Sequence, residues 1–114
     1  MDDVAEYLAR TRATTVLLIT DLEDDLAAIV ESTRESPDDE HDPEGSTVGF
    51  ERARVGSLLA RTRRSLSDID EALERVRQGT YGTCERCGDS ILSERLKVLP
   101  TARLCIACAV SSYP

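Results

Sequence analysis

The residues best suited to chemistry are the four cysteines of the chain, which form two C-x2-C pairs within residues 81–109. The pairs are Cys84 with Cys87 and Cys105 with Cys108, separated by 17 residues. A C-x2-C-x17-C-x2-C pattern has the spacing typical of a four-thiolate zinc site. Four thiolates fill the tetrahedral coordination of Zn²⁺ and leave no open position for a substrate. The sequence therefore predicts one structural Zn²⁺ per chain, bound by these four cysteines.

Other uses of the four cysteines are less consistent with the sequence. Two disulfides would need an oxidising compartment, and the acidic start "MDDVAEYLAR" lacks the apolar stretch of a signal peptide. A thioredoxin-like C-x-x-C motif expects a βαβ context, which the pattern does not indicate. An iron–sulfur cluster remains an alternative, although its ligands usually lie closer together in sequence. A redox switch, in which oxidation of Cys84 or Cys105 ejects the metal, also remains open.

The neighbours of the cysteines also suit a metal site. Gly88 follows Cys87 and allows the backbone to turn, so that N–H groups can point at the sulfurs. Four thiolates around a dication leave a formal charge of about −2. Arg86 and Arg103 are the nearby cations that could offset this charge.

Two long helices precede the cysteine segment. Residues 3–35 contain no Pro or Gly, and residues at steps of three or four form one stripe: Val4, Leu8, Thr11, Thr15, Leu18, Leu22, Leu26 and Ile29. A second helix is predicted to about Gln78, where Gly79 would end it. Its heptad stripe is Val55, Leu59, Thr62, Leu66, Ile69, Leu73 and Val76.

These patterns predict a mostly α protein, an antiparallel two-helix coiled-coil hairpin with a small C-terminal four-cysteine zinc finger. Arms of a larger helix bundle and halves of a dimer remain alternatives. The predicted division is a hairpin at 1–79, with a loop at about 36–46, and a zinc module at 80–114. The loop sequence "SPDDEHDPEGS" combines Pro, Gly and acids. Asp42 before Pro43 suits a helix N-cap, and Ser46 is the other candidate.

The charge distribution excludes several classes of function. The 114 residues carry 14 Lys and Arg against 22 Asp and Glu, a net charge of −8. This balance argues against broad nucleic-acid binding, which needs a cationic surface. No apolar run approaches the roughly 20 residues of a membrane span. The sequence shows no nucleophile–base pair and no open metal position of the kind that would indicate an enzyme. We therefore expect a cytoplasmic, monomeric, non-enzymatic protein.

Opposite charges should attract the two helices to each other. Residues 1–45 hold 14 acids and 3 bases, whereas residues 46–114 hold 11 bases and 8 acids. We expect five arginines of the second helix to face acids of the first. The arginines are Arg61, Arg63, Arg64, Arg75 and Arg77, and the acids include Asp21, Glu23, Asp24 and Asp25.

The segment from Tyr81 to Ala109 resembles the C4 zinc finger of the DksA/TraR family of bacterial transcription regulators. The matching features are "YGTCERCG", Ile91, the Arg95–Leu96 pair, "PTARLC" and "IAC". The resemblance implies a regulator that binds RNA polymerase without sequence-specific DNA binding. It also implies that the hairpin enters the secondary channel and places its acidic tip near the catalytic magnesium. The candidate tip residues here are Asp39, Glu40, Asp42 and Glu44.

The chain departs from the family pattern at two places. The family's two tip aspartates and alanine correspond here to His41, Glu44 and Ser46, so only one carboxylate keeps its register. Members that bind the alarmone guanosine tetraphosphate have basic residues at positions that correspond to Asp68, Leu99 and Ala109. Because none of these is basic, we expect no alarmone site of that type.

Three further expectations follow from the sequence. His41 is expected to be a solvated loop side chain, and Val48 and Phe50 are expected to pack within the hairpin.

The alternative function is a zinc-stapled adaptor, or a redox- or zinc-responsive interaction module, that acts on another partner.

Overall fold

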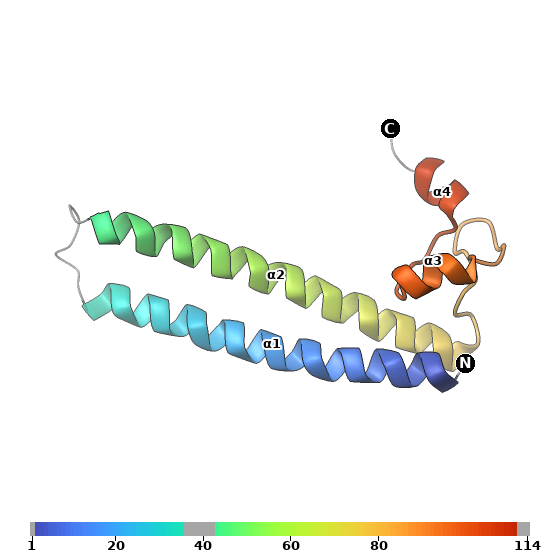
Figure 1. Cartoon of the computed structure of the whole chain (residues 1–114), viewed down its shortest axis with the longest axis horizontal. Helices are drawn as coiled ribbons and strands as arrows, with labels where there is room; N and C mark the ends of the chain where they lie inside the picture. The colour runs from blue at the N-terminus through green and yellow to red at the C-terminus, as the bar shows by residue number, and fades with distance from the viewer. Residues whose placement is uncertain (1, 36–42, 112–114) are drawn as a thin grey trace. The chain divides into compact units, whose positions relative to one another are not determined.

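The computed structural model describes residues 2–35 and 43–111, together with the side chains of most of them. Two long helices, α1 (Asp2–Glu35) and α2 (Pro43–Gln78), are followed by two short ones, α3 (Ser93–Val98) and α4 (Ile106–Ser111) (Figure 1). Within the described part of the chain, β-type pairing is limited to one antiparallel bridge between Thr83 and Ser90. The observed class is therefore the predicted one, a two-helix coiled coil with a small cysteine module.

The chain divides into two compact units, and both long helices contribute to each of them. The first unit combines Met1–Arg12 with Ser67–Pro114, and the second is Ala13–Leu66. The second unit has a core of four buried side chains, two from each helix: Ile19, Leu22, Val55 and Leu59. Partly buried residues that pack against them are Leu26, Ile29, Leu58 and Leu66. These contacts confirm the predicted coiled-coil stripe of α2.

One polar residue of that stripe is also buried. Thr62 is 7% exposed, and its Oγ1 donates a hydrogen bond of 2.7 Å to the carbonyl oxygen of Leu58. This bond satisfies the hydroxyl within the same helix, so that it needs no partner across the seam. A threonine at this seam position is therefore compatible with a dry contact between the helices.

The stripe predicted for α1 is wrong at one position. Leu18 is 44% exposed, and Ile19 is the buried residue at this level. A step of four from Thr15 reaches Ile19, whereas the predicted step of three reached Leu18. With 3.6 residues per turn, a helical stripe mixes three- and four-residue steps, and only the packing of the partner helix decides where each longer step falls.

The core of the first unit combines buried residues from its two separate segments, Met1–Arg12 and Ser67–Pro114. Leu8 of α1 is 1% exposed, and Ile69 and Ala72 of α2 are 5% and 0% exposed. Nearby, the Arg12 Nε donates to the Asp70 Oδ1 over 2.6 Å, joining the two helices at the surface. The buried residues that follow α2 are Cys84 and Ile91. The cysteine module and the two helix segments therefore form one packed body.

The predicted attraction between the helices is realised at Arg63, whose Nη2 lies 2.8 Å from the Glu23 Oε2. Two of the other four predicted arginines make different contacts. Arg77 pairs with Glu74 within α2, and Arg75 contacts the cysteine module. Sequence charge alone could not assign these partners, because each guanidinium can reach several carboxylates along or across the helices.

Helix α2 ends as predicted. Gly79 has a φ of 77°, and the N–H groups of Thr80 and Tyr81 both donate to the carbonyl of Arg75. The left-handed conformation at Gly79 lets the chain turn sharply while it satisfies a terminal carbonyl of the helix. In residues 2–35 and 43–111, no helix has both the length and the apolar content that a bilayer span requires.

Candidate metal centre

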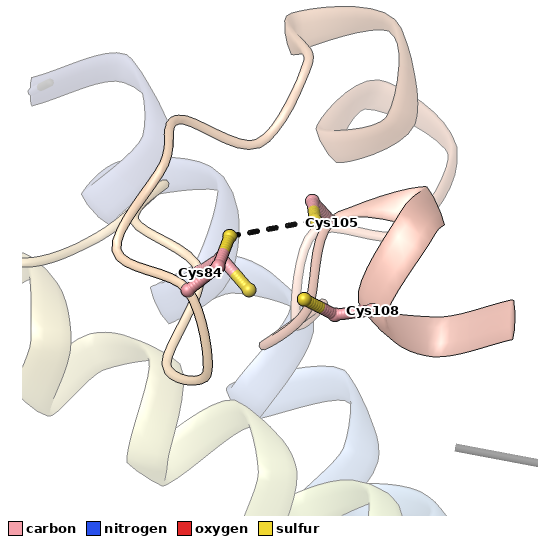
Figure 2. Close-up of side chains that lie close together, drawn as sticks. Cys84, Cys105 and Cys108 are labelled. Carbon is pink, nitrogen blue, oxygen red and sulfur yellow. Dashed lines mark hydrogen bonds between the residues drawn. The ribbon is translucent and has the colours of Figure 1, made fainter. Parts of the chain in front are cut away.

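The four cysteines come from two separate segments of the module. Cys84 and Cys87 lie in the turn that follows Thr83, Cys105 directly precedes α4, and Cys108 lies in α4. Figure 2 shows the sulfurs of the labelled Cys84, Cys105 and Cys108 turned toward one another. Cys84 is buried, Cys105 and Cys108 are half-buried, and Cys87 is exposed. The site is therefore closed on one side and reaches the surface at Cys87.

The distances between the sulfurs fit one tetrahedral zinc ion. All four Sγ atoms lie within 4.8 Å of one another, and those of Cys87 and Cys105 are 3.8 Å apart. A tetrahedron with Zn–S bonds of about 2.3 Å has sulfur–sulfur edges of about 3.8 Å. The cluster and its all-thiolate donor set are therefore consistent with one structural zinc ion, as the sequence predicts. When bound, zinc would cross-link the two segments and supply no open coordination position.

Backbone N–H groups favour the thiolate form of one cysteine, Cys84. The N–H groups of Cys87 and Cys105 donate to the Cys84 sulfur, and they lower the pKa of Cys84 to about 6. The N–H of Arg86 acts in the same direction more weakly. By contrast, a side-chain hydrogen bond with Cys105 raises the pKa of Cys108 to about 12. Because zinc binds all four sulfurs as thiolates, its binding must displace the proton of a cysteine whose pKa is raised, such as Cys108.

The turn that carries the first cysteine pair depends on backbone geometry. Gly88 has a φ of 82°, and its N–H donates to the carbonyl of Cys84 over 3.0 Å. The N–H of Cys84 in turn donates to the carbonyl of Asp89 over 2.8 Å. Because L side chains rarely adopt this φ, the glycine predicted from the sequence has a specific structural purpose.

Two arginines attach the cysteine module to α2 from opposite directions. Arg75 of α2 donates to the carbonyl of Thr101 over 3.3 Å and lies 3.9 Å from the Glu85 carboxylate. Arg103 of the module reaches back to Asp68 over 3.5 Å and also pairs with Glu71. The Arg103 side chain therefore pairs with acids of α2, while its carbonyl accepts from the N–H of Glu85 beside Cys84.

Further hydrogen bonds hold the loop between α3 and α4. The Tyr81 hydroxyl donates to the carbonyl of Pro100 over 2.8 Å, and burial raises the pKa of this phenol. The Arg95 Nε donates to the carbonyl of Leu104 over 2.9 Å. These roles of Tyr81 and Arg75 could not be predicted from sequence patterns, because their partners are backbone carbonyls more than 15 residues away.

Most of the candidate acidic tip residues lie outside the residues that the structure describes. Asp39, Glu40 and Asp42 lie outside the described residues, as do Asp38 and His41. Glu44 lies in the first turn of α2, but its side chain is outside the description. The tip assignments therefore remain predictions from the sequence.

Two of the three positions that correspond to the family's alarmone contacts lie together. Asp68 and Ala109 line a cavity of about 330 Å³, and Leu99 lies at the end of α3 with 48% of its surface exposed. The other lining residues are Glu85, Arg95, Thr101, Arg103 and Leu104. Asp68, one of the three positions, therefore lies in this cavity beside Glu85, Arg95 and Arg103.

Comparison with known proteins supports one family. The family described as the prokaryotic dksA/traR C4-type zinc finger matches residues 79–114. The RNA polymerase-binding transcription factor DksA of Caulobacter vibrioides is 46% identical over 46 residues, which are 40% of this chain and 32% of that protein. General stress protein 16O of Bacillus subtilis is 32% identical over 68 residues, 60% of this chain and 42% of that protein. The chain thus matches less than half the length of these curated relatives.

The structural likeness extends further than the sequence matches. The solved structure of transcription factor DksA2 from Pseudomonas aeruginosa aligns with a TM-score of 0.77 and 29% identity. The alignment covers 97% of this chain and 81% of that one, so it includes the coiled coil as well as the cysteine module. The C4 finger match at residues 79–114, the DksA relatives and this shared architecture all support the DksA/TraR family, whose zinc finger the cysteine module resembles.

Proposed function

We propose that this protein is a non-enzymatic transcription regulator that binds RNA polymerase and inserts the acidic end of its coiled coil into the secondary channel. The observation that carries the proposal is the likeness to DksA2 over 97% of the chain, combined with the C4 finger match at residues 79–114. Relatives named as RNA polymerase-binding transcription factors support the choice of partner. In this proposal the protein acts as a cytoplasmic monomer and makes no sequence-specific contact with DNA.

In this proposal the four cysteines, Cys84, Cys87, Cys105 and Cys108, are the ligands of the structural zinc. Their sulfur positions support the assignment, because all lie within 4.8 Å of one another. Zinc fixes the module, and the module in turn contacts α2 through Arg75 and Arg103. The metal thereby supports the coiled coil at the end remote in sequence from the acidic segment.

The acidic segment would act through its carboxylates. Asp39, Glu40, Asp42 and Glu44 supply hard oxygen atoms that suit magnesium or basic loops of a polymerase. His41 and Ser46 occupy two of the family's tip positions in this chain. Glu44 is therefore the carboxylate in register, and Asp42 lies one position away from a tip position. We therefore assign the effect on transcription chiefly to Asp42 and Glu44.

A neutralised tip should separate binding from activity. In the Asp42→Asn/Glu44→Gln variant, polymerase core should still be captured in a pull-down, because the rest of the coiled coil is unchanged. The effect of the protein on a defined in vitro transcription reaction should fall at least about tenfold, since two charges near the reaction centre are lost. The control is Asp24→Asn/Glu31→Gln, which removes two exposed carboxylates from α1. Equal transcription effects of wild type and tip variant would reject the role of the tip.

We also propose that the protein lacks an alarmone site of the family type. Asp68 lines the cavity at one of the relevant positions, and its carboxylate lies 3.5 Å from Arg103. A phosphate group would meet this carboxylate and Glu85, and would compete with Asp68 and Glu71 for Arg103. Equilibrium dialysis with guanosine tetraphosphate should therefore detect no saturable binding at concentrations up to about 1 mM, a dissociation free energy near 4 kcal/mol. Saturable binding that Asp68→Lys strengthens would disprove the proposal.

A further inference from the structure

An exposed row of side chains on α2 combines an aromatic ring with three arginines. It consists of Phe50, Arg54, Ser57, Arg61 and Arg64, and we call it the arginine stripe. We propose that this stripe is the surface of the coiled coil that binds an acidic protein surface on the partner. The inference rests on the proposed function, since it names the side of the coiled coil that RNA polymerase would contact.

The spacing of the stripe places its members on one face of the helix. Successive members are four, three, four and three residues apart, which keeps them aligned along a helix of 3.6 residues per turn. All five are exposed, whereas Val55 and Leu59 on the other side of α2 are 2% and 4% exposed. The stripe therefore points away from α1 and is open to a partner.

Phe50 is the most unusual member of the stripe. It was expected to pack within the hairpin, but 76% of its surface is exposed. It is also the single Phe of the chain. Exposed aromatic rings and arginines are enriched where protein interfaces derive most of their binding energy. The coiled coil itself therefore gains little from Phe50, and a partner with an apolar pocket would gain more.

Two arginines of the stripe are available for a partner. Arg63, which lies off the stripe, pairs with Glu23, and Arg54 donates to Glu51 over 2.6 Å. Among the residues that the structure describes, neither Arg61 nor Arg64 forms an ion pair. They are three residues apart on one face, so their guanidinium groups can reach neighbouring carboxylates on a partner.

The charge pattern of the second unit indicates the chemistry of that partner. Residues 47–66 of α2 contain five arginines and one acid, whereas residues 13–34 of α1 contain five acids and one arginine. A partner that docks on α2 must therefore be acidic. We favour a protein over a nucleic acid, because the net charge of −8 and the acids of α1 repel a continuous phosphate backbone. Phe50 also calls for an apolar pocket beside the partner's acids.

The test measures binding of the full-length zinc-loaded protein to purified RNA polymerase core at two salt concentrations. Phe50→Ala and Arg61→Glu/Arg64→Glu should each weaken binding at least about tenfold, as expected for residues at the centre of an interface. The charge-reversed variant should also lose most of the salt dependence of the association rate. The controls Leu17→Ala and Arg52→Glu remove an exposed apolar and an exposed basic side chain outside the stripe, and both should bind within about twofold of wild type.

The possible outcomes separate the inference from the proposed function. If wild type fails to bind polymerase core, the proposed function fails and this inference fails with it. If wild type binds and both stripe variants bind within twofold of it, only the inference is overturned. Circular dichroism checks folding, and Arg61→Gln/Arg64→Gln replaces the reversed variant if that variant loses helicity. Loss of affinity for a duplex DNA probe, with polymerase binding unchanged, would overturn the inference in favour of nucleic acid.

Discussion

Replacing Cys84 with serine should abolish stable zinc binding and unfold the cysteine module. Structural zinc contributes on the order of 10 kcal/mol or more in small zinc-binding modules, and an alkoxide is no substitute for a thiolate. Cys84 is 1% exposed, and its sulfur accepts backbone N–H groups from both cysteine segments. Its loss therefore removes a metal ligand and also a point at which the two segments meet. Zinc content of reductant-purified protein should fall from about one per chain to near zero.

The coiled coil should survive this loss better than the module does. Helices α3 and α4 have six residues each, against 34 in α1 and 36 in α2. Helicity by circular dichroism should therefore fall only slightly, while limited proteolysis should cut rapidly after residue 80. Ala107→Ser is the matched control, because it places the same hydroxyl between Cys105 and Cys108 at an exposed position. If Cys84→Ser retained a full equivalent of zinc, the proposed ligand set would be wrong.

Leu59→Ala should lower the free energy of unfolding by about 2–5 kcal/mol, the usual range for a leucine removed from a core. Leu59 is 4% exposed and belongs to a cluster of only four buried residues, so neighbouring side chains have little material with which to fill the cavity. Small domains have a total stability of only about 5–15 kcal/mol. The midpoint of urea unfolding, followed by helicity, should therefore shift clearly downward.

Leu17→Ala makes the same chemical change at a surface position. Leu17 is 67% exposed, and truncating it should change the free energy of unfolding by less than about 0.5 kcal/mol. Equal effects at Leu17 and Leu59 would mean that the two helices do not pack along the seam described here. A larger effect at Leu17 would mean that α1 contacts α2 through the face that carries Leu17.

The four-cysteine site could be predicted from the sequence, because cysteine spacing is a local pattern and thiolates have a specific metal chemistry. Two C-x2-C pairs at zinc-site spacing restrict both the donor set and the geometry, and the sulfurs of Cys87 and Cys105 lie 3.8 Å apart. The end of α2 at Gly79 could be predicted equally well, because few residues adopt a positive φ without strain. The division into a hairpin at 1–79 and a module at 80–114 stays a prediction.

The features that could not be predicted depend on how helices face each other. The choice between Leu18 and Ile19 in the core rests on the phase of α1 against α2, which periodicity fixes only to within one residue. The exposure of Phe50 shows the same limit, since hydrophobicity alone does not say which side of a helix is covered. Arg103 was expected to offset the charge of the metal site, yet its guanidinium pairs with Glu71 and Asp68 because the module packs beside α2.

The first packed unit also determines when the protein can finish folding during synthesis. Residues 3–12 complete this unit only with residues 67 onward, so 54 intervening residues, 13–66, must be translated first. Leu8 consequently leaves the ribosome long before the segment that buries it, and the loop between them must close. Metal loading and the burial of the earliest-translated helical turns therefore belong to the same late stage of biogenesis.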